Sequence, residues 1–311
     1  MVLSLLGDFH GMPDRIATTV DGRRLALGNL EKVLWPATGF TKGEALHYYA
    51  LVAPALLPQV CRRPASFVRF PDGVEGELFH IKHPPPGLPE WAPTAEIHGK
   101  EGTRRQVLVD DMATLMALAN LAALEVHVPQ WTVDGGRNAH DRLVVDLDPG
   151  PGVGLPECCR VACLVRSALA EDGLECWVKT SGSKGLHLYA PIAPAPGRLV
   201  SDYARALAQR LEADRPDLVL HRMARQLRQG KVFVDWSQNA SAKTTAAAYT
   251  LRAGRTPAVS APVGWDEVAG CTRAEDLSFT PGQVLARIER DGDLFAALAD
   301  PGRARPLPPA S

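Results

Sequence analysis

The second half of the chain alternates stretches with the period of a strand and stretches with the period of a helix, and this order constrains the fold more than any other feature. Four stretches predict strands, at residues 143–148, 175–180, 186–192 and 232–236. Two stretches between them predict helices, at residues 156–172 and 199–213. The order β-α-β-β-α-β is that of a ferredoxin-like or RRM-like unit. Because such a unit arranges its strands as 4-1-3-2, the first strand should lie between the third and the fourth.

The first half is less regular, and both ends of the chain predict little structure. Thr41 predicts the N-cap of a helix, and residues 111–119 have the apolar spacing of another. Residues 99–105 predict a polar hairpin-like loop. Residues 1–22 are mixed and expected to be loosely held, and the four prolines of residues 301–311 predict a tail. The whole therefore predicts an α+β fold with an N-terminal α/β subregion.

Composition favours a cytoplasmic protein with reduced cysteines. The chain of 311 residues has no run of 18 apolar residues, and residues 1–8 lack a basic segment, so neither a membrane span nor a secretory signal is expected. The six cysteines are sparse and include no CxxC pair, which disfavours both a disulfide scaffold and structural zinc. The formal net charge of −1 means that any nucleic-acid binding depends on local basic patches.

Three aspartates fall on neighbouring strands of the predicted sheet. Asp146 and Asp148 share one face of the first strand, because side chains alternate, and Asp235 interrupts the apolar fourth strand. Alone, the first pair could be strand-end acids and the third a paired structural acid. With the 4-1-3-2 order the three converge, and converging carboxylates suit two Mg²⁺ or Mn²⁺ ions that act on a phosphoryl group.

Candidate anion-binding groups follow on the other neighbour of the first strand. The turn at residues 181–185 is rich in Ser and Gly and contains Lys184, and His187 lies on the strand after it. Small residues let backbone N–H groups approach a phosphate, while Lys184 and His187 add donors. The turn alone is a weak signal, and a lone buried histidine is more often structural. Their position next to the acids makes a triphosphate site the stronger interpretation.

Basic residues and one further histidine leave two interpretations open. Arg222, Arg225 and Arg228 recur in steps of three before the Asp235 strand, as either a solvated basic helix face or a clamp on phosphates. Arg252 follows that strand. His127 is either a satisfied core histidine or a contact to a sugar.

Three segments, at residues 140–150, 180–187 and 231–239, resemble the motifs of archaeo-eukaryotic primases. More closely, the chain resembles the polymerase domain of bacterial LigD and its stand-alone primase-polymerase relatives, in order over residues 25–295. The resemblance implies an archaeo-eukaryotic primase-like fold with an RRM-like catalytic core. Since no ligase or phosphoesterase region follows, we expect the free-standing form.

The resemblance also divides the chain. It implies an N-terminal extension at residues 1–24, the primase-polymerase domain at 25–295 and a Pro-rich tail at 296–311. Within the domain, residues 25–135 would bind the 5′-phosphate and DNA, and residues 136–260 would form the RRM-like catalytic core.

Site residues are carried over position by position. The metal-binding and catalytic residues would be Asp146, Asp148 and Asp235, with two Mn²⁺ ions in preference to Mg²⁺. The residues that bind the NTP or dNTP would be His127, Ser181, Lys184, Gly185, His187, Arg228, Gln238 and Arg252. The residues that bind DNA and a downstream 5′-phosphate would be Asn29, Lys32, Lys42, Phe79 and Arg69. The family has paired aromatics where this chain has Leu78-Phe79-His80, so its handling of the template should differ.

The resemblance implies a DNA-dependent nucleotidyltransferase that fills short gaps or ends in DNA repair and readily uses ribonucleotides. Its DNA would carry gaps or ends with a 5′-phosphate, and Ku and a separate ATP-dependent DNA ligase are candidate partners. The expected location is the cytoplasm, at the bacterial nucleoid. Two alternatives are a non-catalytic protein that binds or bridges DNA ends, and a metal-dependent phosphohydrolase.

Overall fold

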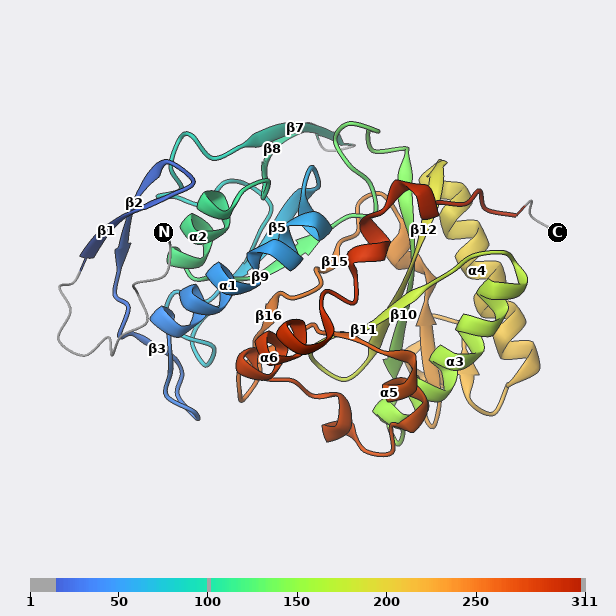
Figure 1. The fold of residues 1–311 in the computed structure, drawn as a ribbon. Coiled ribbons are helices and arrows are strands. Elements are labelled where there is room, and N and C mark those ends of the chain that lie inside the picture. The colour runs from blue at the N-terminus through green and yellow to red at the C-terminus, as the bar shows by residue number, and fades with distance from the viewer. Residues whose placement is uncertain (1–14, 100–101, 309–311) are drawn as a thin grey trace.

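Two large β-sheets with helices packed against them, one antiparallel and one mixed, dominate the part of the chain that the computed structural model describes, residues 15–99 and 102–308 (Figure 1). We call them the N-terminal sheet and the C-terminal sheet. No helix of the described residues has the length and apolar character needed to cross a membrane.

The C-terminal sheet confirms the predicted strand order. Its strands run β13-β14-β10-β12-β11-β18, and the four central ones are the fourth, first, third and second strands of the β-α-β-β-α-β unit. Their bounds are β10 His140–Pro149, β11 Trp177–Thr180, β12 Leu186–Ala195, β13 Val219–Leu220, β14 Val232–Asp235 and β18 Pro262–Val263. The helices of the unit, α3 Leu155–Glu171 and α4 Gly197–Asp214, share a hydrophobic core with this sheet.

The N-terminal sheet packs with the two helices of the first half. Its order is β15-β9-β5-β8-β7, with β6 paired to β5. The bounds are β5 Pro64–Arg69, β6 Phe79–Ile81, β7 Thr94–Gly99, β8 Gly102–Leu108, β9 Ala123–Val128 and β15 Thr245–Ala246. The helices are α1 Lys42–Val60 and α2 Met112–Asn120. Thr41 caps α1 as predicted, in a capping box in which its hydroxyl accepts from the Glu44 N–H at 3.2 Å.

Short elements complete the fold. The paired strands are β1 Arg15–Val20 with β2 Arg23–Gly28, β3 Val33–Trp35 with β4 Phe40–Thr41, and β16 Leu251–Arg252 with β17 Ala258–Val259. The remaining helices are α5 Trp265–Gly270 and α6 Pro281–Asp291, and the 3₁₀ turns are η1 Arg225–Leu227, η2 Trp236–Asn239, η3 Ala274–Leu277, η4 Ala296–Ala299 and η5 Pro301–Arg303.

Alternation along β10 points its acids toward the N-terminal half. Leu143, Val145 and Leu147 belong to the core with α3 and α4. Val144, on the opposite face, belongs to the core of the N-terminal half. Because Asp146 shares this face with Val144, its carboxylate faces the space between the two sheets.

Two glycines let loops approach the end of β10 closely. A Cβ at Gly150 would lie 1.9 Å from the carbonyl oxygen of Arg228, and a Cβ at Gly185 would lie 2.0 Å from that of Leu147. No side chain fits at either distance. These glycines therefore hold the segment with Arg228 and the turn before β12 directly against the strand that carries the acids.

Both ends of the described chain are more ordered than the sequence suggested. Residues 15–22, expected to be loose, belong to the β1–β2 hairpin, whose two turn residues Asp21 and Gly22 both have positive φ. The expected Pro-rich tail, as far as it is described, packs on the protein. Leu298 is buried, and Arg305 forms a β-bridge with Ile192. Residues 1–14 and 309–311 of the two predicted end segments lie outside the described residues.

One of the two interpretations of the arginines at 222, 225 and 228 is wrong. They do not form a helix face, because only η1 interrupts an otherwise irregular segment there. The boundaries at 135 and 260 stay predictions, and β15, from the second of these parts, pairs with β9 in the N-terminal sheet. Beyond residue 260, β18 adds an edge strand to the C-terminal sheet.

Candidate active site

Four polar residues form a transverse row across the C-terminal sheet. Asp146 pairs in register with Asp235 on one side and with His187 on the other, and His187 pairs in turn with Lys179. Residues directly opposite each other on neighbouring strands point to the same face. The register of the sheet thus places two acids, an imidazole and an amine side by side.

Three carboxylates meet at one end of this row. Oxygens of Asp146, Asp148 and Asp235 all lie within 4.8 Å of one another. Burial, followed by the charges of Asp148 and Asp235, raises the pKa of Asp146 well above its usual range. Burial and the charge of Asp235 likewise raise the pKa of Asp148. A divalent cation bound by these oxygens would relieve this repulsion, so the residues fit a Mg²⁺ or Mn²⁺ site.

Asp235 is oriented by the turn that follows it. Its Oδ1 accepts from the Ser237 N–H at 3.1 Å and from the Ser237 hydroxyl at 2.5 Å, and its Oδ2 accepts from Gln238 Nε2 at 3.0 Å. Gln238, expected to contact a nucleotide, therefore holds a carboxylate of the candidate metal site.

A cavity of about 410 Å³ opens beside the acids and is lined by all eight residues expected to bind a nucleotide. Asp146 and Asp148 line it as well. These residues come from both sheets, since His127 is on β9 while His187 is on β12. We call this cavity the nucleotide pocket. The structure brings the predicted residues together, and their individual roles stay predictions.

Two guanidinium groups of the nucleotide pocket contain unsatisfied donors. Arg228 Nε and Arg252 Nε are buried, and neither has a hydrogen-bond partner among the described residues. The Arg228 guanidinium is held in place by the ring of Phe233, whose centroid lies 3.7 Å from its central carbon. Because buried donors are rarely left unpaired, these two indicate an anion in the pocket.

Ser181 organises the turn on the opposite wall. Its Oγ accepts from the N–H groups of Ser183 and Gly185 at 3.2 and 3.1 Å, and its own N–H donates to the Gly185 carbonyl at 2.9 Å. Lys184 is exposed at the tip of this turn and lines the pocket. The turn is therefore preformed and presents an exposed cation to a ligand.

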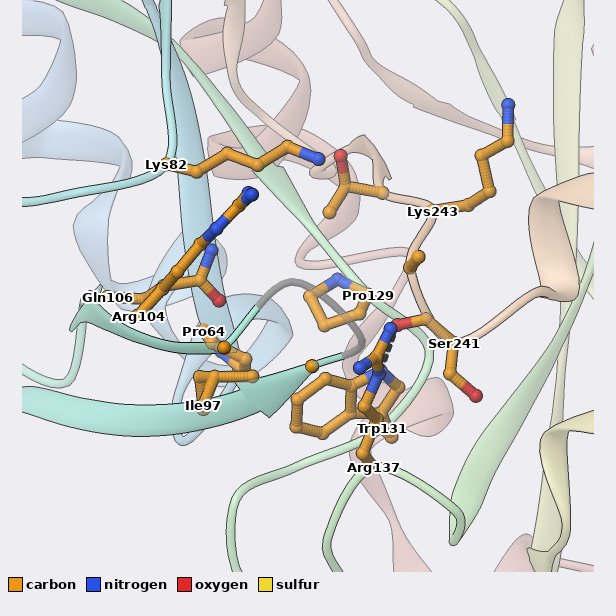
Figure 2. A pocket seen from close by; sticks show the side chains of 14 residues that line it. Pro64, Lys82, Ile97, Arg104, Gln106, Pro129, Trp131, Arg137, Ser241 and Lys243 are labelled. Carbon is orange, nitrogen blue, oxygen red and sulfur yellow. Dashed lines mark hydrogen bonds between the residues drawn. The ribbon is translucent and has the colours of Figure 1, made fainter.

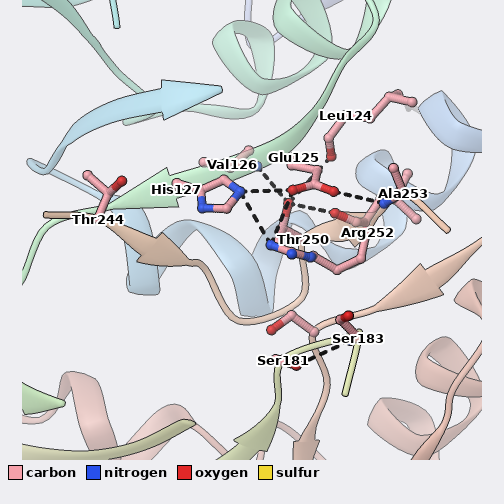
Figure 3. A network of polar contacts seen from close by, with 12 residues as sticks. Leu124, Glu125, Val126, His127, Ser181, Ser183, Thr244, Thr250, Arg252 and Ala253 are labelled. Carbon is pink, nitrogen blue, oxygen red and sulfur yellow. Dashed lines mark hydrogen bonds and ion pairs between the residues drawn. The ribbon is translucent and has the colours of Figure 1, made fainter. Parts of the chain in front are cut away.

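Glu125 contacts both His127 and Arg252, two residues of the pocket that lie far apart in the sequence (Figure 3). Its Oε2 lies 2.9 Å from His127 Nε2 and 3.2 Å from Arg252 Nη1, and its Oε1 accepts from the Ala253 N–H at 2.8 Å. Burial raises the pKa of Glu125, but the bond from His127 and the Arg252 charge outweigh burial and hold it below its usual range. Glu125 is thus a buried carboxylate that fixes both neighbours.

Burial favours the neutral form of His127 in this network. Burial is the main cause that lowers the pKa of His127, and the charge of Arg252 adds to it against the opposing hydrogen bond to Glu125. Since Nε2 faces the Glu125 carboxylate, the single ring proton belongs on Nε2. Nδ1, on the far side of the ring in Figure 3, is then a hydrogen-bond acceptor for a ligand.

Lys179 is fully buried and orients His187 from behind. Its Nζ lies 2.6 Å from Ser260 Oγ and 2.9 Å from His187 Nδ1. The Ser260 hydroxyl donates to the Thr180 carbonyl, so Ser260 accepts from Lys179. Lys179 has a further N–H for His187 Nδ1, which leaves the ring proton on Nε2, 3.3 Å from Asp146 Oδ1.

The residues expected to bind a 5′-phosphate form two groups. In the first, the Lys32 N–H donates to the Asn29 carbonyl, and Lys42 Nζ donates to the Gly28 carbonyl at 2.5 Å. In the second, Arg69 and the exposed Phe79 pair across β5 and β6. An ion pair links the two groups. Asp72, in the loop just after β5, lies 3.0 Å from the amine of Lys32.

Sequence reasoning missed Glu125 and Lys179. Glu125 stands two residues before His127 on one strand, the same spacing that marked the first two aspartates. Lys179 is a lysine in a central strand, where a charged side chain requires partners. The sequence contains both of these signals, but only the strand pairing in the structure shows which residues Glu125 and Lys179 contact.

Comparison with known proteins adds to this geometry. Residues 41–295 match the family model described as LigD, primase-polymerase domain. The chain is 44% identical over 277 residues to the multifunctional non-homologous end joining protein LigD of Mycolicibacterium smegmatis, covering 88% of this chain and 36% of that protein. It is 32% identical over 244 residues to the LigD of Pseudomonas aeruginosa, covering 76% of this chain and 28% of that protein. The chain thus spans about a third of the length of these relatives.

One solved structure is closely similar over nearly its whole length. It is the polymerase domain from Mycobacterium tuberculosis ligase D in complex with DNA, with a TM-score of 0.84 and 43% sequence identity. The likeness covers 89% of this chain and 98% of that domain. The archaeo-eukaryotic primase-like fold expected from the sequence is thereby confirmed.

Proposed function

This chain belongs to the LigD primase-polymerase family, and from that membership we propose that it is a template-dependent nucleotidyltransferase that fills short gaps and ends during DNA repair. One observation carries the proposal. One pocket is lined by Asp146 and Asp148, two of the three converging carboxylates, and by Arg228 and Arg252, each with a buried, unsatisfied guanidinium donor. Carboxylates suit divalent cations and guanidinium groups suit phosphates, so the pocket matches a nucleoside triphosphate with its metal ions.

The reaction transfers a nucleotide to a primer. The primer 3′-hydroxyl oxygen attacks the α-phosphorus, the bond from that phosphorus to its bridging oxygen breaks, pyrophosphate leaves and the hydroxyl proton passes to solvent. Two bound divalent ions, Mn²⁺ in preference to Mg²⁺, would supply charge stabilisation at the attacking and leaving oxygens. Arg228, Arg252 and Lys184 would hold the triphosphate, and His187 Nε2 would donate to it or to Asp146.

The hydrogen-bond acceptor at His127 Nδ1 favours a ribonucleotide, whose sugar has both the 2′- and the 3′-hydroxyl. A neutral imidazole with its proton directed at Glu125 can accept a hydrogen bond at Nδ1 from a ribose hydroxyl. We therefore propose that ribonucleotides are used readily.

Glu125 gives the first prediction. We expect Glu125→Gln to raise the KM for the nucleotide about tenfold with a smaller change in kcat, because a hydrogen-bonded charge is lost behind His127 and Arg252. Steady-state extension kinetics would measure both constants. The matched control is Glu267→Gln, since Glu267 is also paired with an arginine, Arg287, and also accepts from a backbone N–H. Equal effects of the two variants on KM would contradict the positioning role of Glu125.

The proposed 5′-phosphate contact gives a pH prediction. Burial, followed by the charge of Lys32, lowers the pKa of Lys42 to about 8. Lys42 is therefore cationic below that pH and loses its charge as the pH rises through it. We expect the preference for a 5′-phosphorylated over an unphosphorylated gap to fall about fivefold from about pH 7 to about pH 9.5, which corresponds to about 1 kcal/mol for the loss of one charged hydrogen bond.

Fluorescence anisotropy with the two gapped duplexes measures this preference. Lys42→Arg keeps a cation at all these pH values and should give a flat profile. Lys32→Gln removes the neighbouring charge and should move the midpoint to higher pH. A wild-type preference that does not change with pH would refute the assignment of Lys42.

The function itself is tested by incubating the protein with Mn²⁺ or Mg²⁺, NTPs or dNTPs, and a short gapped duplex with and without the 5′-phosphate. Primer extension that depends on the template and increases with the phosphate supports the proposal. Tight binding without incorporation would indicate a non-catalytic end-binding protein, and phosphate release without primer growth a phosphohydrolase. Ku and a separate ATP-dependent ligase are the partners that an end-joining role implies.

A further inference from the structure

A carboxylate of the protein itself contacts one of the two lysines proposed to bind the 5′-phosphate. Asp72 Oδ1 accepts a hydrogen bond from Lys32 Nζ at 3.0 Å, although the two residues are 40 positions apart in the sequence. Within residues 15–99 and 102–308, Lys32 is the sole hydrogen-bond partner of the Asp72 carboxylate, and 79% of the Asp72 side chain is exposed. The carboxylate is therefore not needed to build the loop that carries it.

Backbone contacts hold Asp72 beside Lys32. The loop after β5 turns at Gly73, whose φ is +86°, and the Val74 N–H donates to the Leu34 carbonyl of β3 at 2.8 Å. A Cβ at Gly73 would lie 3.0 Å from the same carbonyl oxygen, so the loop packs directly against the strand that follows Lys32. The carboxylate thus stays within reach of Lys32 when the ion pair opens.

The charges around Lys32 are not balanced. After burial, the charge of Lys32 is the second cause of the low pKa of Lys42, so the two amines lie near each other. The partner of Lys42 Nζ is the uncharged Gly28 carbonyl, and Asp72 supplies one negative charge to the two cations. A terminal phosphate has a charge of about −1.5 to −2 at pH 7. It can balance both lysines if it takes the place of Asp72.

Another basic surface of this chain has no such carboxylate. A cavity of about 330 Å³ beside the β7–β8 hairpin is lined by four cationic residues and by no carboxylate among the described residues, the cations being Lys82, Arg104, Arg137 and Lys243 (Figure 2). A surface that only attracts phosphates gains nothing from an acid, because the acid lowers the local positive potential. The pairing of Asp72 with Lys32 therefore indicates a task other than attraction.

We propose that Asp72 is an internal competitor of the 5′-phosphate, which takes Lys32 back as the phosphate leaves and so speeds its release. This inference rests on the proposed function, because it takes Lys32 and Lys42 as the phosphate contacts. Filling a gap leaves a nick, and the reaction that seals a nick joins the new 3′-hydroxyl to this same phosphate. A polymerase that kept the phosphate bound would block that reaction, so competition by Asp72 hands the product on.

The test compares a 5′-phosphorylated with an unphosphorylated gapped duplex. Fluorescence anisotropy gives the affinities, and stopped-flow displacement by unlabelled duplex gives the dissociation rates. Asp72→Asn keeps the size of the side chain and removes its charge. We expect this variant to bind the phosphorylated duplex about fivefold more tightly, mainly through slower dissociation, and the unphosphorylated duplex within about twofold of wild type. The gain should shrink at high salt, because the ion pair is exposed.

Two further variants assign the effect to Lys32. In a Lys32→Gln background, Asp72→Asn should change binding of the phosphorylated duplex by less than about 1.5-fold, because no cation is left for Asp72 to take. The matched control is Glu75→Gln, which removes the same charge at an exposed position of the same loop. It should leave both affinities within about twofold of wild type.

Three results would overturn the proposal: no gain with Asp72→Asn, equal gains on both duplexes, or a gain that persists without Lys32. A gain that comes from faster association, with unchanged dissociation, would overturn the role in release. Failure of the wild type to extend any primer would refute the polymerase function instead, while a selective gain on the phosphorylated duplex would still support competition by Asp72.

Discussion

Replacing Asp146 with asparagine should reduce primer extension at least about 10³-fold. Metal ions in such a centre supply several kcal/mol of transition-state stabilisation, and each 1.4 kcal/mol corresponds to about a tenfold change in rate. We expect Asp146 to be essential for holding these ions, because it lies in register between Asp235 and His187. Extension of a labelled primer under single-turnover conditions measures the change.

The same substitution should make the metal-free protein more stable. Burial and the charges of Asp148 and Asp235 raise the pKa of Asp146, so the folded state binds this proton more tightly than the unfolded chain. The contribution of this group to stability is therefore most favourable below the ordinary aspartate pKa. It falls as pH rises to the raised folded value and stays reduced above that value. At neutral pH with EDTA, Asp146→Asn should thus raise the melting temperature.

Added Mn²⁺ separates the two effects. It should raise the melting temperature of the wild type, because an ion that binds only the folded state stabilises it, and should have much less effect on the variant. Asp202→Asn, at an exposed position on α4, is the control and should behave as wild type. Retained extension by Asp146→Asn would remove Asp146 from the metal site.

Lys179→Met should reduce kcat/KM for the nucleotide by about 10- to 100-fold, because it removes a buried hydrogen bond that orients His187. Methionine keeps the length of the side chain but cannot donate to His187 Nδ1. The ring would then lose the partner that directs its Nε2 proton toward Asp146 and the pocket. We expect a larger KM as the main change.

A double-mutant cycle tests whether Lys179 acts through His187. In a His187→Gln background, Lys179→Met should have little further effect on KM, because its target is already gone. Fully additive effects would mean that Lys179 has only a packing role. Circular dichroism and thermal melting of each variant report separately on folding.

The sequence predicted the acids and the residues that line the nucleotide pocket, but it missed the residues that hold those side chains in place. The β-α-β-β-α-β order was sufficient to place Asp235 beside Asp146, because the strand order of that unit follows from its topology. Lys179 and Glu125 were missed because each acts on a residue of another strand or loop, and pairing registers are not visible in periodicity. The metal, nucleotide and 5′-phosphate roles of the predicted residues stay predictions.

At both ends of the chain, the prediction of little structure followed the amino-acid composition and overlooked short-range features that favour order. The Asp21-Gly22 pair is a strong hairpin signal, yet the mixed composition around it suggested a loose segment. At the other end, proline content suggested a tail, although one β-bridge at Arg305 and one buried leucine, Leu298, are enough to dock an irregular segment. The prolines prevent a regular helix or strand in this C-terminal segment, but the segment still packs in a defined position on the protein.

The return of the chain to the N-terminal sheet has a consequence for biosynthesis. β15 joins β9 only after all four strands of the β-α-β-β-α-β unit have been made. During translation, the N-terminal sheet must therefore wait, with the edge of β9 unpaired, until residue 246 has left the ribosome. The nucleotide pocket, which also needs Arg252, is among the last parts of the protein to form. A nascent or truncated chain that ends earlier carries the acids but no complete triphosphate site.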